Sequence, residues 1–302
     1  MWRFFLFVFL ILFHLPAYAA GNTHCNPKII EVREPANVHY DPFDSRPRTE
    51  IVRVILQNTA SIACKGRLVF FSAGERKLSS STNGRFLDYD LQSQAGQEIG
   101  KDHNSSNAIR FNIPANTKRF EVKADMVIPA QQYVSSGHYR QNIEARIFEE
   151  ASSTQAFNNT YDFALSAYIY PQAGISLAGS AGAHYSHGKR NAVMDFGTLK
   201  RGDKKSIFVK VRANQPYKMV FTSENNGQMR NLDVSGHFIK YRADLDGKGL
   251  NFFSGSQDIV KKRITDSRGD SHKLSVNIGN TSEKAAGRYQ DIITIDVFPL
   301  EY

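Results

Sequence analysis

The sequence predicts an all-β protein, because helical periodicity is nearly absent and short alternating segments recur along the chain. Clusters rich in Gly, Asn, Ser and Asp separate these segments, for example residues 79–84 and 224–227. Strands of four to eight residues between such turn-forming clusters are typical of a β-sandwich or barrel. The predicted strands include residues 51–56, 67–71, 119–122, 207–211, 217–221 and 274–278.

An internal repeat predicts two domains. Residues 137–148 match residues 287–298 in their Gly, Tyr, Ile and Phe positions at one offset, 287 − 137 = 150. Each copy is a predicted turn followed by a strand at the end of its half, although chance similarity between two strands is the alternative. Residues 51–71 resemble residues 205–221 more loosely. We therefore predict domains over residues 20–155 and 171–302.

The first 19 residues predict a secretory signal peptide. Arg3 precedes an apolar run from Phe4 to Leu15, and Ala17-Tyr18-Ala19 has the pattern of a cleavage site. The apolar run is short for a membrane-spanning helix, which needs roughly 20 residues; an uncleaved anchor is the alternative. We expect a secreted protein with a mature N-terminus near Ala20.

Two cysteines, Cys25 and Cys64, predict one disulfide, because an even pair in an oxidising compartment is normally bonded. Metal binding by the pair is the alternative. The formal net charge is +9 and the charges are scattered. A solvated basic face is the main interpretation, anionic surface polymers are the alternative, and a nucleic-acid partner is not expected of a secreted protein.

No catalytic motif has the spacing that its chemistry requires, so we expect no enzyme, cofactor or metal site. His184 and His187 have a metal-compatible spacing, but they lie in a predicted loop rich in Gly, Ala and Ser. Four aromatic residues of the first half are candidates for an adhesive surface, with burial in the core as the alternative. They are Tyr40, Phe43, Phe86 and Tyr89.

Several segments resemble the spore coat protein U domain family, the pilin module of archaic (Csu-type) chaperone–usher pili. Residues 127–139 resemble its strand, Pro-Ala turn and Gly-x-Tyr signature, and residues 87–91 its leucine–tyrosine strand. In the second half, residues 194–199 resemble its phenylalanine–glycine strand, and Pro216-Tyr217 with residues 224–230 its next hairpin. The second half departs from the family by lacking cysteines, and residues 241–253 fit poorly.

The resemblance implies immunoglobulin-like, pilin-type sandwiches in tandem, the second lacking a strand that a partner supplies by β-augmentation. The implied partners are a periplasmic pilus chaperone, an outer-membrane usher and the next pilin subunit, which binds by donor-strand complementation. The implied groove wall is the last strand, with the Tyr302 carboxylate as a chaperone anchor. Its residues are Ile292, Ile293, Ile295, Val297 and Phe298.

The connection, residues 156–170, is predicted to be a linker or a donor strand. Phe163, Leu165, Ala167 and Ile169 lie on one face of an alternating segment that resembles a pilin donor extension. We expect this segment to insert into the first domain of its own chain. The alternative is that it forms the first strand of the second domain.

These observations predict a structural and adhesive subunit at the tip of an archaic chaperone–usher pilus, located in the fimbrium at the cell surface and serving attachment and biofilm formation. A disulfide at Cys25 would pin the start of the mature chain, so the chain would accept a strand without donating one. Residues 75–84 and 92–107 would then face the target. The alternative is a secreted carbohydrate-binding β-sandwich acting without a pilus.

Overall fold

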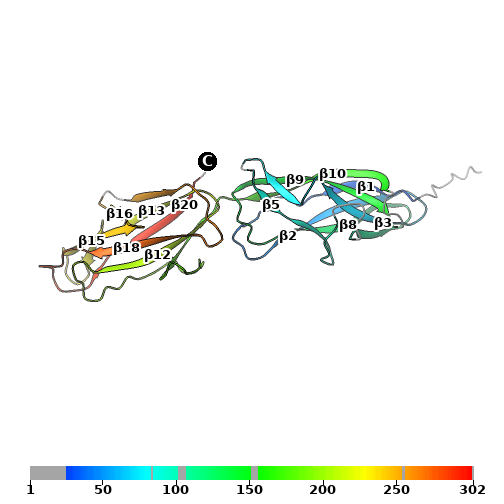
Figure 1. Cartoon of the computed structure of the whole chain (residues 1–302). Coiled ribbons are helices and arrows are strands. Elements are labelled where there is room, and N and C mark those ends of the chain that lie inside the picture. The colour runs from blue at the N-terminus through cyan, green and yellow to red at the C-terminus, as the bar shows by residue number, and fades with distance from the viewer. Residues whose placement is uncertain (1–24, 83, 101–106, 151–155, 254–255, 301–302) are drawn as a thin grey trace, which may run out of the picture.

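The protein is all-β, and its two sandwiches lie end to end (Figure 1). The computed structural model describes residues 25–82, 84–100, 107–150, 156–253 and 256–300. The predicted signal peptide and Tyr302 lie outside these ranges. Among the described residues, no helix is long and apolar enough to cross a membrane.

The first domain packs two antiparallel sheets face to face. One sheet has the order β1-β2-β8-β6 and the other the order β5-β4-β9-β3-β7, with β10 paired to β9. The strands are β1 (Lys28–Arg33), β2 (Arg48–Asn58), β3 (Cys64–Ser72), β4 (Lys77–Ser80), β5 (Phe86–Asp88), β6 (Asp90–Ser93), β7 (Ile109–Ile113), β8 (Thr117–Ile128), β9 (Gly137–Glu149) and β10 (Ala156–Ile169).

Alternation along these strands builds the first core. Side chains of a strand point to opposite faces in turn, so every second residue faces the other sheet. One sheet contributes Val52, Val54 and Leu56 of β2, which are fully buried. From the other side, β9 contributes Ile143 and Ala145.

The predicted disulfide is confirmed, because Cys25 is bonded to Cys64 at the start of β3. The bond fastens the first described residue to the second sheet. The two cysteines are 39 positions apart in the sequence. In the chain-entropy model, a loop of this length stabilises a fold by about 4 kcal/mol.

Replacing both cysteines by serine (Cys25→Ser with Cys64→Ser) is expected to lower the free energy of unfolding of the first domain by about 4 kcal/mol. Calorimetry of the full mature chain measures the loss, since the second domain provides an internal reference. Intact-mass measurement with and without reductant checks that the unaltered protein carries the bond. An unchanged melting temperature for the first domain would contradict the prediction.

The second domain has the same layers. Its larger sheet has the order β11-β12-β18-β15-β14-β19, with β16 paired to β15, and its smaller sheet the order β17-β13-β20. The strands are β11 (Ala173–Ala178), β12 (Lys204–Ala213), β13 (Tyr217–Ser223), β14 (Gln228–Asn231), β15 (Phe238–Leu245), β16 (Lys248–Leu250), β17 (Gln257–Lys261), β18 (Asp270–Ile278), β19 (Tyr289–Gln290) and β20 (Ile293–Pro299).

The two copies of the sequence repeat adopt the same local structure. Gly137 has a φ of 141° and Gly287 a φ of 142°, values that residues with a Cβ rarely adopt. Two residues later, the Tyr139 hydroxyl donates a hydrogen bond to the carbonyl oxygen four residues before it, at 2.8 Å. Tyr289 makes the same bond at the same distance. The repeat is therefore a repeated turn that opens a strand.

Asn214 of the second domain fixes the connection between the domains. Its side-chain amide donates to the carbonyl oxygen of Tyr170 at 2.8 Å and its side-chain oxygen accepts from the amide of Gln172 at 2.7 Å. The neighbouring Gln215 amide donates to the Ser136 hydroxyl of the first domain. Asn214 is almost fully buried. The chain therefore leaves β10 and enters β11 along a defined path.

Candidate strand-acceptor site

Strand β10 belongs to the first domain. It pairs with β9 in antiparallel register from Ala156 opposite Phe148 to Ile169 opposite Gly137. The side chains of its alternating face are at most 8% exposed and pack in the first core. They are Phe163, Leu165, Ala167 and Ile169, the four residues singled out in the sequence.

Both edges of β10 are occupied. Opposite β9, the amide of Tyr168 donates to the carbonyl oxygen of Val38 at 2.8 Å, and the amide of Tyr40 donates to the carbonyl oxygen of Tyr168 at 3.0 Å. β10 also lies beside β1. The segment is thus not the first strand of the second domain, a place that β11 takes.

In the second domain, the strand that corresponds to β9 lacks such a neighbour. β20 pairs with β13 and, among the described residues, with no other strand. Its core-facing residues Ile293, Ile295 and Val297 pack against the second core but are only partly buried. Their counterparts 150 positions earlier, on β9 beside β10, are between 0% and 2% exposed: Ile143, Ala145 and Ile147.

Strand β11 also lies close to β20. Ile175 and Leu177 face the second core from β11 and are also only partly buried. In the first domain, Ile29 and Val32 of β1 are 4% and 8% exposed next to β10. We call Ile175, Leu177, Ile293, Ile295 and Val297 the acceptor edge. The two β11 residues were missed in the sequence, although their alternation was a usable signal.

Two residues predicted for the groove wall lie elsewhere. Ile292 and Phe298 are 50% and 47% exposed. Ile292 immediately precedes β20 and Phe298 lies within it. The odd-numbered residues of this strand face the core, so the even-numbered positions point to the opposite face. Including them in the wall was wrong for this reason, whereas Ile293, Ile295 and Val297 have the required orientation.

A buried polar network joins the two sheets beside the acceptor edge. The Tyr217 hydroxyl, on the strand paired with β20, donates to the Asp270 carboxylate at 2.7 Å and lies 2.9 Å from Nε2 of His272. Nδ1 of His272 lies 2.7 Å from the Asp246 carboxylate. Burial and the hydrogen bond to Asp270 raise the pKa of Tyr217 above its ordinary value. The hydroxyl therefore stays protonated and holds β13 to β18.

Asp246 completes the network from the turn after β15. Burial raises the pKa of its carboxyl, but the hydrogen bonds from His272 and from the amide of Lys273 outweigh burial and lower it. Asp246 is therefore ionised at neutral pH. With β13 fixed in this way, β20 has a rigid neighbour on its paired side.

The aromatic residues proposed as an adhesive surface do not form one. Tyr40 and Tyr89 are 3% and 2% exposed and belong to the first core, so their assignment to a surface was wrong. The Tyr40 hydroxyl donates to the carbonyl oxygen of Pro129, whereas the Tyr89 hydroxyl donates to Gln141. Phe86 is 55% exposed and Phe43 is partly buried. Positions 86 and 89 differ by an odd number in extended chain, so they face opposite sides.

One end of the predicted target-facing segment 75–84 lies near the start of β9. Ser80, at the end of β4, pairs with Tyr139 at the start of β9. That start also lies opposite Ile169, where the chain passes into the second domain. The end of β4 at Ser80 therefore lies toward the second domain. Residues 101–106 of the other loop lie outside the described residues.

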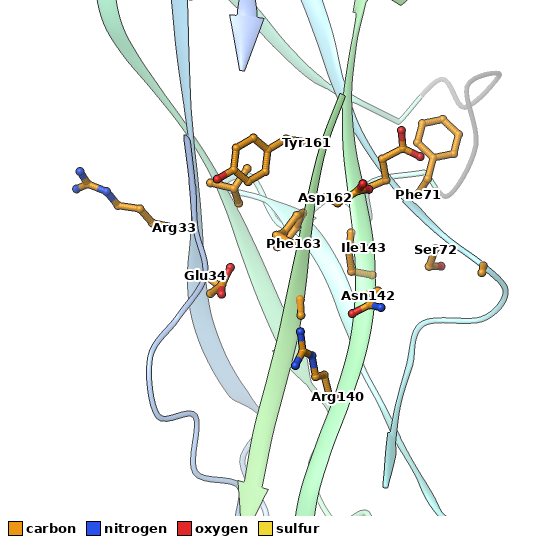
Figure 2. Close-up of a pocket in the computed structure, with 14 residues that line it drawn as sticks. Arg33, Glu34, Phe71, Ser72, Arg140, Asn142, Ile143, Tyr161, Asp162 and Phe163 are labelled. Carbon is orange, nitrogen blue, oxygen red and sulfur yellow. The ribbon is translucent and has the colours of Figure 1, made fainter. Parts of the chain in front are cut away.

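An open hollow of about 1140 Å³ crosses β9 and β10 in the first domain. Figure 2 shows Arg140 and Asn142 on β9, Asp162 and Phe163 on the neighbouring β10, and Arg33 of β1 on the other side of β10. Charges of both signs line it. No group of three or more His, Cys, Asp or Glu residues that could hold a metal occurs in the part of the chain that is described. The His187 ring packs against that of Tyr185.

Comparison with known proteins found similar solved structures, but no family model matches the chain and no curated protein matches it by sequence. A solved structure with a similar fold is the CsuC–CsuE chaperone–tip adhesion subunit pre-assembly complex from archaic chaperone–usher Csu pili of Acinetobacter baumannii. It is 13% identical, with a TM-score of 0.45, over 91% of this chain and 92% of that chain.

Two further structures have lower scores. The CupB6 tip adhesin from Pseudomonas aeruginosa is 12% identical, with a TM-score of 0.38, over 91% of this chain and 93% of that chain. The CssB subunit of enterotoxigenic Escherichia coli, complemented with a donor strand from CssA, is 18% identical, with a TM-score of 0.30. It covers 46% of this chain and 97% of that chain.

Proposed function

We propose that this chain is an adhesive tip subunit of a chaperone–usher pilus, and that its second domain accepts a strand from a partner at the acceptor edge. One contrast carries the proposal. The first domain, in which β10 pairs with β9, buries Ile143, Ala145 and Ile147, whereas the second domain leaves Ile293, Ile295 and Val297 only partly buried. An added strand would cover these side chains and pair with the free edge of β20.

The proposed partners are those that the resemblance to pilin modules implies, and the chemistry of this edge fits them. Unpaired strand edges with apolar side chains promote aggregation, so the subunit needs a protecting strand before assembly. A periplasmic chaperone would supply that strand first, an outer-membrane usher would exchange it, and the neighbouring pilin would supply the final one. A secreted carbohydrate-binding sandwich acting alone has no use for an uncovered edge, which favours the pilus subunit.

The tip position is supported by the disulfide at Cys25, the first described residue. Cys25 is bonded to Cys64 in the first domain's own sheet, which tethers the segment that a shaft subunit would extend toward its neighbour. The segment that resembles a donor extension, β10, is already paired with β9 and with Val38. Attachment to surfaces and biofilm formation are the roles we assign to such a subunit.

Immunogold labelling of pili on cells that express this chain with its chaperone and usher tests the proposal. We expect one gold particle at the free end of each fibre. The triple variant Ile293→Asp, Ile295→Asp and Val297→Asp should remove the label, because charges on the acceptor edge exclude a donated strand. Particles spaced along the fibre would overturn the tip assignment. Labelled fibres in the triple variant would overturn the acceptor edge.

A further inference from the structure

An exposed group of aromatic rings lies on the first domain where it meets the second. His39 is the bridge partner of Tyr168, and Tyr168 is the cross-strand partner of His138, so these three residues lie side by side across the sheet. Tyr170 follows two residues after Tyr168. Tyr168 and Tyr170 are 38% and 50% exposed, in contrast to the buried Leu165 of the same strand.

The rings contact one another closely. The His39 and Tyr170 rings are stacked, with centroids 4.9 Å apart and an interplanar angle of 27°. The Tyr168 and Tyr170 rings meet edge to face at 4.8 Å. Such arrangements stabilise aromatic pairs beyond the burial of their area. The rings therefore support each other while exposing apolar faces to solvent.

Beside the rings is a hollow of about 400 Å³. Asn37, His39, His138 and Ser166 contribute polar groups to its lining, and Tyr168 and Tyr170 contribute rings. None of the described residues that line it is Asp, Glu, Lys or Arg. A small hollow with apolar faces and a few convergent polar groups is typical of small-ligand sites.

We propose that this hollow binds an uncharged pyranose sugar. The C–H face of a pyranose packs on the π-face of an aromatic ring, and its hydroxyl groups pair with amide, imidazole and hydroxyl groups of the kinds supplied by Asn37, His39 and Ser166. An anionic sugar or a nucleic acid is normally bound by Lys or Arg, and neither occurs among the described residues of the lining. The neutral and partly aromatic lining therefore favours an uncharged saccharide.

The site is held in place before any ligand arrives. The backbone of Tyr168 is hydrogen-bonded to Val38 and Tyr40 on one side and pairs with His138 on the other. The carbonyl oxygen of Tyr170 accepts a hydrogen bond from Asn214 of the second domain. Little ordering is thus required on binding, which lowers the entropic cost of association. Through Asn214, the second domain also helps to position one ring of the site.

The inference goes beyond the proposed function, because a sugar site of this kind does not require a pilus. Its test uses the full mature chain and an array of neutral glycans, followed by saturation-transfer NMR with the methyl pyranosides that correspond to the positive spots. We expect millimolar to micromolar binding of at least one neutral pyranoside. Tyr168→Ala and Tyr170→Ala should each weaken it at least tenfold, while the first domain stays folded and its melting temperature falls by only a few degrees.

The matched control is Phe253→Ala, which removes an aromatic side chain of the second domain that is 62% exposed; it should leave sugar binding unchanged. Absence of binding to every neutral glycan, binding to acidic glycans alone, or tyrosine variants that bind as tightly as the unaltered chain would overturn the inference. Failure here is distinguishable from failure of the proposed function. Tip labelling of pili does not depend on sugar binding, and sugar binding by the purified chain does not depend on pili.

Discussion

Fusing a second copy of the β10 sequence (residues 156–169) behind β20, through a copy of residues 150–155, is expected to raise the melting temperature of the second domain by more than about 10 °C. The added strand would cover the acceptor edge as β10 covers the corresponding side chains of β9. Completing the burial of five partly buried apolar side chains contributes roughly 5 kcal/mol, and the new ladder of backbone hydrogen bonds adds to it. Calorimetry and size-exclusion chromatography measure the gain in stability and the expected loss of aggregation.

The matched control carries the same added segment with aspartate at the positions that correspond to Leu165 and Ile169. It has equal length and nearly equal composition, but it cannot place its apolar face on the acceptor edge. We expect it to melt and aggregate like the unfused chain. If both fusions behaved alike, or if the unfused second domain proved monomeric and as stable as the first, the open edge would not be a strand-binding site.

The double substitution Leu165→Asp with Ile169→Asp is expected to lower the free energy of unfolding of the first domain by more than about 5 kcal/mol. Both side chains are 0% exposed in the first core. Each substitution removes a fully buried apolar side chain and places a carboxylate where no water reaches, and either effect alone costs several kcal/mol. Calorimetry of the full chain should show the first domain's transition shift or vanish.

The control is Ser166→Asp, on the outward face of the same strand and opposite Arg140. It should leave the first domain's melting temperature nearly unchanged, because surface substitutions seldom alter stability by more than about 0.5 kcal/mol. If the double substitution lowered the melting temperature of the second domain and left that of the first domain unchanged, β10 would stabilise the second domain and not the first. That result would remove the structural basis for treating the first domain as complete.

Patterns with a short period were readable without coordinates. The all-β fold follows from alternation and turn residues, and alternation also identified the buried face of β10, from Phe163 to Ile169. The offset of 150 positions located two turns that share one backbone conformation, at Gly137 and Gly287. The Cys25–Cys64 bond followed from the cysteine count and the expected compartment. Each of these inferences needs residue type and position in the sequence, and no knowledge of what lies across the core.

Tertiary structure decided which strand neighbours which, and therefore which apolar side chains are covered. Ile143 and Ile293 occupy equivalent positions of the repeat. Ile143 is buried beside β10, whereas Ile293 has no such neighbouring strand among the described residues and is only partly buried. The same holds for the aromatic residues: Tyr40 and Tyr89 are buried by strands remote in sequence, whereas Tyr168 and Tyr170 are exposed beside His39. The sequence alone determined the periodicity, the repeat and the disulfide partners, because these depend on residue type and spacing. Burial depends on contacts between distant segments, so the acceptor edge and the aromatic hollow became visible when the strands were placed in their sheets.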